Sequence, residues 1–124
     1  MAMVFLQVPV LGQTEMSRIS GSVTYEERLG LAKNSTIHIR LEDVTNPTAP
    51  PVVLAEKTVS SDHSQAPISF SLFVPKTQVH SGHKYAVSAE VEMGGKIWLR
   101  GRKELHHAPV HNFANITILV SLVS

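Results

Sequence analysis

Histidine is the residue type in this sequence best suited to chemistry, and the chain has seven histidines. An imidazole transfers protons near neutral pH and also binds metals. Two groups stand out by their spacing: His80-Ser-Gly-His83, and His106-His107 followed by His111. A zinc site needs three or four converging ligands with supporting partners. The chain has no cysteine, and these groups have no evident acidic partner, so we interpret them as solvated loop histidines.

Other catalytic arrangements are also incomplete. A hydrolase serine sits on a Gly-x-Ser-x-Gly turn with a base and an orienting acid, and this pattern is absent from the sequence. Glu42 and Asp43 are adjacent, but neighbouring strand residues point to opposite faces. Gly94-Gly95 joins two expected strands and opens no helix, so it does not predict a phosphate loop. We therefore predict a protein that is not an enzyme and has no cofactor, with a small hydrolase or a histidine metal site as the remaining alternatives.

The elements that carry these residues belong to one small domain. The chain has 124 residues, 43% of them hydrophobic, which is enough for one core without disulfides. Eleven Lys and Arg against ten Asp and Glu give a net charge of +1, so no strong field favours nucleic acid or an anionic membrane. We expect a flexible lead-in over residues 1–16 and a single domain over residues 17–124.

Apolar and polar residues alternate with a period of two through nearly the whole chain, which predicts an all-β domain. The clearest strand has Ile37, Ile39 and Leu41 on one face. The expected strands cover residues 19–25, 36–42, 52–59, 68–72, 85–93, 96–103 and 116–123. About seven short strands favour a single-domain antiparallel β-sandwich, with a small barrel as the alternative. A helical turn plugged by Val79 is expected after Pro75.

The hairpin around Gly94-Gly95 permits a prediction of register. A two-residue loop would pair Met93 with Lys96 and split the apolar rows of the two strands. A three-residue loop over residues 93–95, with Gly95 left-handed, keeps those rows together. The pairs predicted in this way are Glu92 with Lys96, Val91 with Ile97, and Ala89 with Leu99. Trp98 would then lie on the outer face directly beside Glu90.

Trp98, the only tryptophan, is therefore expected to be exposed near Arg100. An aromatic residue beside arginine is a frequent interface anchor; alternatively, arginine stems simply cover it. Leu119 and Val123 raise a similar question because the last strand is apolar on both faces. It is either a central strand covered on both sides or part of a groove for a partner's apolar helix or strand. The candidate partner-binding residues are Trp98, Arg100, Leu119 and Val123.

Five pieces of the sequence resemble one family in their order and spacing. The pieces are Gly21-Ser-Val-Thr-Tyr-Glu-Glu-Arg28, Arg40-Leu-Glu-Asp-Val44, Val53-Leu-Ala-Glu56, Pro67-Ile-Ser-Phe70, and His83-Lys-Tyr-Ala-Val87 followed by Gly95-Lys96. The segment from Ser17 to Arg102 is similar to the YscW-type lipoprotein chaperones, which are the pilotins of type III secretion. It is also similar to the related YbaY-type envelope lipoproteins. The tail after Lys103 carries no motif of this family.

The resemblance implies a β-sandwich on the periplasmic side of a Gram-negative outer membrane. For the pilotin branch it implies binding to the C-terminal segment of a secretin subunit, and help with the localisation and assembly of that subunit. Family members usually carry an N-terminal cysteine for a lipid anchor, whereas this sequence has no cysteine. Contact with the outer membrane is expected only through such an anchor. A YbaY-like accessory domain without a secretin partner is the alternative function.

Overall fold

The computed structural model describes residues 15–25, 35–60 and 67–123. The strands are β1 (Met16–Thr24), β2 (Thr36–Asp43), β3 (Val52–Ser60), β4 (Ile68–Pro75), β5 (Tyr85–Met93), β6 (Lys96–Glu104), β7 (Phe113–Leu119) and β8 (Ser121–Leu122). A 3-10 turn, η2 (Lys76–Gln78), follows β4, and Val79 is buried directly after it. The expected turn with its apolar plug is therefore confirmed. Most of the expected lead-in lies outside the described residues, and its boundary stays a prediction.

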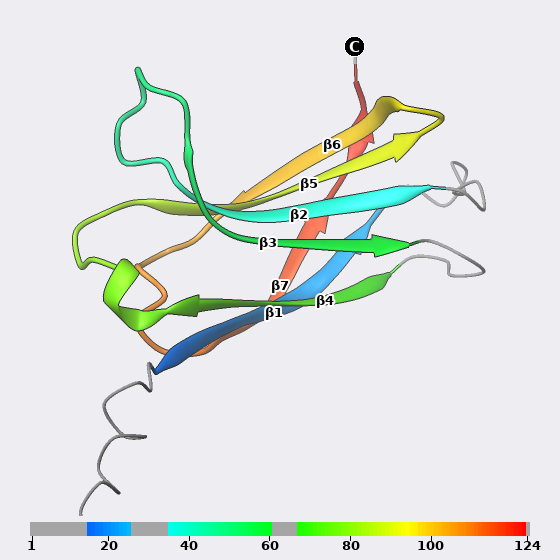
Figure 1. The fold of residues 1–124 in the computed structure, drawn as a ribbon. Helices are drawn as coiled ribbons and strands as arrows, with labels where there is room; N and C mark the ends of the chain where they lie inside the picture. The colour runs from blue at the N-terminus through cyan, green and yellow to red at the C-terminus, as the bar shows by residue number, and fades with distance from the viewer. Residues whose placement is uncertain (1–14, 26–34, 61–66, 124) are drawn as a thin grey trace, which may run out of the picture.

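The strands form two sheets that pack face to face (Figure 1). A three-stranded sheet has the order β4-β1-β7, and a five-stranded sheet has the order β3-β2-β5-β6-β8. The predicted all-β sandwich is confirmed. Two details differ from the prediction: the described residues contain eight strands, and β7 runs parallel to β1 while the other pairs are antiparallel.

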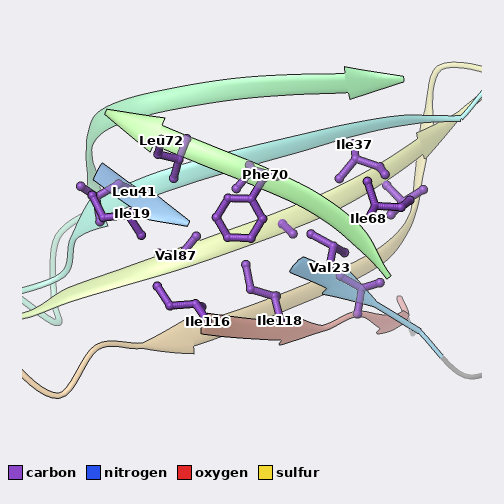
Figure 2. Close-up of a cluster of buried hydrophobic side chains, with 14 of the residues drawn as sticks. Ile19, Val23, Ile37, Leu41, Ile68, Phe70, Leu72, Val87, Ile116 and Ile118 are labelled. Atoms are coloured by element: carbon purple, nitrogen blue, oxygen red, sulfur yellow. The ribbon is translucent and has the colours of Figure 1, made fainter. Parts of the chain in front are cut away.

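The core lies between the sheets, where the inward faces of the strands meet. In β2 the three alternating residues Ile37, Ile39 and Leu41 are fully buried, as their spacing predicted. Figure 2 shows apolar side chains converging from both sheets, with Phe70 of β4 among them. Each fully buried aliphatic side chain stabilises the fold by about 1.5–3 kcal/mol relative to an exposed one. This shared core fixes which face of every strand remains outside.

The apolar run near the end of the chain divides into two strands, where one strand over residues 116–123 was predicted. After Leu119 the chain leaves the three-stranded sheet, and the Val120 N–H donates to the Thr24 carbonyl at 2.9 Å. β8 then pairs with β6 in the five-stranded sheet. Since β7 and β8 each lie at the edge of a sheet, a central strand covered on both faces is excluded.

Gly101 of β6 makes this crossing possible because it has no side chain. A Cβ atom there would overlap the carbonyl oxygen of Leu119 and lie 3.0 Å from the Cα of Val120. Gly21 of β1 has the same role beside β7, where a Cβ atom would overlap the carbonyl oxygen of Ile116. The two glycines therefore let the C-terminal segment lie directly against the backbones of both sheets.

The predicted register of the β5–β6 hairpin is wrong. Met93 pairs with Lys96, so the loop has two residues instead of three. Gly94 and Gly95 have φ values of 61° and 80°, and positive φ at both central residues is the requirement of a type I′ turn. A glycine pair meets this requirement with little steric cost. The tight turn therefore forms, and the apolar rows are realigned further along the strand.

A β-bulge at Trp98 realigns those rows. Trp98 is an extra residue between the pairs Glu92–Ile97 and Val91–Leu99, which replace the predicted pairs of Val91 with Ile97 and Ala89 with Leu99. A bulge shifts the register of one strand by one residue and bends it locally. Leu99 is thereby returned to the core at 2% exposure, while Trp98 remains outside.

Replacing Gly101 with alanine should lower the free energy of unfolding by about 1–3 kcal/mol, because the new methyl group would displace the crossing backbone. Urea denaturation followed by circular dichroism measures this difference. Thr117→Ala, on the exposed side of β7, is the matched control and should change stability by less than about 0.5 kcal/mol. Equal denaturation midpoints for Gly101→Ala and the wild type would contradict the proposed close contact.

Candidate binding site

The outer face of the five-stranded sheet carries a row of ion pairs across four strands, here called the charge row: Glu56, Arg40, Glu90 and Arg100. Arg40 Nε lies 3.0 Å from Glu56 Oε2, and Arg40 Nη1 lies 3.0 Å from Glu90 Oε1. Arg100 Nε lies 2.8 Å from Glu90 Oε2. Glu90 is thus directly opposite Arg100, and the prediction that it lies opposite Trp98 is wrong.

Glu90 lies at the centre of the charge row. Partial burial opposes its ionisation, but hydrogen bonds from Arg40 and Arg100 outweigh that effect and hold the pKa of Glu90 below its ordinary value. The hydrogen bond with Glu90 also raises the pKa of Arg40. Because each carboxylate oxygen of Glu90 accepts a hydrogen bond from a guanidinium group, the residue links β2 and β6 across β5.

Trp98 lies on this outer face beside the hairpin, as predicted. Its indole N–H donates to the Met93 carbonyl at 3.2 Å, and the Lys96 ammonium lies 5.0 Å from its ring centroid. Arg100 is held by Glu90, and Trp98 still keeps 43% of its surface exposed. Neighbouring side chains, Lys96 among them, therefore cover the ring only in part.

Three other exposed apolar residues lie along β6 with Trp98, and together they form the C-terminal patch: Trp98, Leu119, Leu122 and Val123. The Val123 N–H donates to the Trp98 carbonyl at 2.9 Å, Leu122 pairs with Leu99, and the Leu119 backbone lies against Gly101. The exposed fractions of Leu119, Leu122 and Val123 are 57%, 62% and 41%. Apolar side chains exposed together at a sheet edge are typical of a binding surface.

The structure thus places three of the four candidate residues, Trp98, Leu119 and Val123, along β6. The fourth, Arg100, differs from them because it is charged and already paired. Arg100 is adjacent to Trp98, but its guanidinium is engaged by Glu90. Leu122 belongs to the patch and was missed. Simple alternation through one strand assigns Leu122 to the opposite face from Leu119 and Val123. The sheet change at Val120 instead brings Leu122 to the edge of the five-stranded sheet, where it pairs with the core-facing Leu99 and is still 62% exposed; no local sequence signal marks this change.

The loop histidines His80, His83, His106 and His107 are exposed, as expected. The expectation that they lack an acidic partner is wrong for His83, whose Nδ1 lies 2.7 Å from Asp43 Oδ2. Burial opposes the ionisation of Asp43, but hydrogen bonds from Thr45 and His83 hold its pKa below the ordinary value. In residues 15–25, 35–60 and 67–123, no group of three or more His, Asp or Glu residues is arranged to hold a metal.

The surface also contains a shallow hollow of about 670 Å³ where β3 and β4 approach each other. Its lining mixes the charged residues Arg18, Glu56 and Lys57 with serine hydroxyls and the exposed Phe73. No helix in the described part of the chain is long and apolar enough to span a membrane. The fold and its surface therefore define a class: a small β-sandwich with an exposed apolar edge.

Within that class, a family model described as "Type III secretion system lipoprotein chaperone (YscW)" matches residues 14–115. The chain belongs to this family of lipoprotein chaperones, which confirms the resemblance seen in the sequence.

A solved structure of an alternative pilotin from the type II secretion system of Vibrio cholerae has the same fold, with a TM-score of 0.79. The two chains share 27% sequence identity, and the match covers 89% of this chain and 99% of that one. The chain is also 26% identical over 83 residues to the uncharacterized lipoprotein YbaY of Escherichia coli (strain K12). That match covers 67% of this chain and 44% of YbaY, so it spans less than half of YbaY. Family and fold together indicate a chaperone role of the pilotin kind.

Glu90→Gln should lower the free energy of unfolding at neutral pH by about 1 kcal/mol, because Arg40 and Arg100 would lose their shared carboxylate. The folded pKa of Glu90 is lowered, so its stabilisation is present above the unfolded pKa and is lost as pH falls through the folded value. Urea denaturation should therefore show the gap between wild type and variant shrinking below about pH 4.

Glu56→Gln is the matched control, because the Glu56 side chain is 58% exposed and at the end of the charge row. It should change stability by less than about 0.5 kcal/mol. A gap between wild type and Glu90→Gln that persists unchanged at about pH 3 would show that the carboxylate charge is not its cause.

Proposed function

We propose that this protein is a pilotin that binds the C-terminal segment of a secretin subunit and assists its localisation to, and assembly in, the outer membrane. The observation that carries the proposal is the C-terminal patch, in which four apolar side chains each keep at least 41% of their surface exposed. Membership in the lipoprotein chaperone family supports the kind of partner. The patch supplies a surface on which an apolar segment can be shielded from aggregation.

The geometry of the patch favours an amphipathic helix as the bound form of that segment. β8 has only two residues, so its free edge offers few backbone groups for the addition of a strand. The side chains of Trp98, Leu122 and Val123 lie around this edge and offer apolar area instead. A helix with apolar residues at positions i, i+3, i+4 and i+7 presents a matching stripe.

Trp98 is suited to anchor such a helix because it is already held in place. Its indole N–H is bound by the Met93 carbonyl and its ring by the Lys96 ammonium. An interface side chain that is fixed before binding loses less conformational entropy when the complex forms. The bulge that exposes Trp98 is therefore a functional feature in this proposal, consistent with the frequent placement of bulges beside functional sites.

The proposed location is the periplasmic side of the outer membrane. The family description of a lipoprotein chaperone supports this location, since a lipid attached upstream of β1 would hold the sandwich at a membrane surface.

A YbaY-like accessory role in the envelope, without a secretin partner, is the second candidate function. The similarity to the YbaY lipoprotein over 83 residues favours it. The two functions are distinguished by a pull-down in which the full chain is mixed with the C-terminal peptide of the secretin encoded near its gene. Retention of the peptide supports the pilotin function, and its absence from the bound fraction supports the accessory role.

Trp98→Ala should weaken binding of that secretin peptide at least about tenfold, because a central aromatic anchor commonly contributes about 2 kcal/mol or more to binding. Isothermal titration calorimetry measures the affinity, and circular dichroism verifies that the variant is folded. Phe73→Ala is the matched control: Phe73 is another aromatic residue with 54% exposure, but it lies on β4 of the other sheet. Equal losses of affinity in both variants, or no loss in Trp98→Ala, would refute this site.

A further inference from the structure

The hollow of about 670 Å³ where β3 and β4 approach each other plays no part in the proposed secretin site. β3 and β4 are edge strands of different sheets and run side by side (Figure 1). We call this feature the serine hollow after Ser20 of β1 and Ser69 and Ser71 of β4, which line it. These serines alternate with the core residues of their strands, so they belong to the outer face of the three-stranded sheet.

Two cross-strand pairs form the floor of the serine hollow. Ser20 lies directly opposite Ser71, and Arg18 lies directly opposite Phe73, which keeps 54% of its surface exposed. A serine hydroxyl both donates and accepts hydrogen bonds, while an exposed aromatic face offers apolar area. The floor therefore combines the two kinds of contact that a sugar ring makes, one through its hydroxyl groups and one through its C–H face.

An irregularity in β7 adds an amide to the serine hollow. The pairing of β1 with β7 is interrupted between Ile19 and Gly21, and Asn115 has a φ of 63° there and lines the hollow. Asparagine tolerates this left-handed backbone better than most residues with a side chain. Its amide group both donates and accepts hydrogen bonds. Irregular pairing and left-handed residues frequently occur beside functional sites.

The cations of the serine hollow are not neutralised. Arg18 is the only charged residue within β1, β4 and β7, and Lys57 of β3 also lines the hollow. Among the residues that the structure describes, no carboxylate forms an ion pair with either of them. The lining carboxylate, Glu56, accepts a hydrogen bond from Arg40 in the charge row. The serine hollow thus presents two positive charges to an anion.

We propose that the serine hollow binds an anionic saccharide, which is a sugar that carries a phosphate or carboxylate group. Arg18 and Lys57 bind the anionic group, because guanidinium and ammonium groups both pair with phosphate and carboxylate oxygens. The serine hydroxyls and the Asn115 amide bind sugar hydroxyls, and the Phe73 ring packs on the C–H face by dispersion.

Charge complementarity supports an anion as the occupant, and the floor of hydroxyls beside an aromatic ring supports a sugar as its carrier. The volume of about 670 Å³ lies within the range of roughly 300–1,000 Å³ that is usual for small-molecule sites. This inference does not rest on the proposed secretin function.

The test is titration of the full isotope-labelled chain with glucose 6-phosphate, glucuronate, glucose and inorganic phosphate, followed by amide chemical shifts in NMR spectra. Both anionic sugars should shift the amides of Ser20, Ser71 and Phe73. They should bind at least about tenfold tighter than glucose, which has no charge for the two cations, and high salt should reduce this difference. Glucose 6-phosphate should also bind at least about threefold tighter than inorganic phosphate, which has no ring for Phe73.

Two variants separate the contributions of charge and ring. The double variant Arg18→Gln with Lys57→Gln should lose at least about tenfold in affinity for glucose 6-phosphate. Phe73→Ala should weaken glucose 6-phosphate but leave the affinity for inorganic phosphate unchanged, because only the sugar contacts the ring. Circular dichroism verifies that both variants are folded.

The double variant Lys84→Gln with Arg102→Gln is the matched control. It removes the same charge from two residues that are also exposed but line a different hollow, and it should bind the saccharides like the wild type. Trp98→Ala should also keep its saccharide binding, which separates this inference from the secretin site.

Three results would overturn the inference. The first is the absence of any shift with both anionic sugars, including the case in which soluble polyglutamate binds the hollow instead. The second is equal affinity for glucose 6-phosphate and inorganic phosphate, which would show a site for the anion alone. The third is full affinity for glucose 6-phosphate in the folded variant that lacks Arg18 and Lys57.

Discussion

The close approach of the C-terminal segment to Gly101 is the contact on which the proposed site depends. The chain can change sheets at Val120 only because β6 has no side chain at that position. The change of sheet turns the last strand into an edge strand and brings Leu119, Leu122 and Val123 alongside Trp98. One missing methyl group in β6 therefore determines that the C-terminal residues form an exposed apolar edge.

Two local features of the β5–β6 hairpin complete that edge. The tight turn at Gly94-Gly95 shifts the register, and the bulge at Trp98 restores it so that Leu99 returns to the core. The extra residue is the one that remains outside as a potential anchor. Beside it, the charge row links four strands through Glu90, which keeps the polar part of the sheet face internally paired.

The sequence alone predicted the fold class because alternation with a period of two depends only on one face of each strand being buried. It also predicted that Trp98 lies outside. It did not predict the hairpin register, because a glycine pair allows two loop lengths and the bulge is decided by packing further along the strand. The grouping of Leu122 with Trp98 and the pairing of His83 with Asp43 are contacts between distant segments, which local patterns do not specify.

The central claim is that the C-terminal patch receives a secretin segment. Titration of the isotope-labelled chain with the C-terminal secretin peptide, followed by amide chemical shifts in NMR spectra, tests it most directly. The account predicts that the largest changes occur at Trp98, Leu119, Leu122 and Val123, with little change around the loop histidines His106 and His107 or beside Phe73. Changes concentrated in the hollow between β3 and β4, with the C-terminal patch unaffected, would contradict the account.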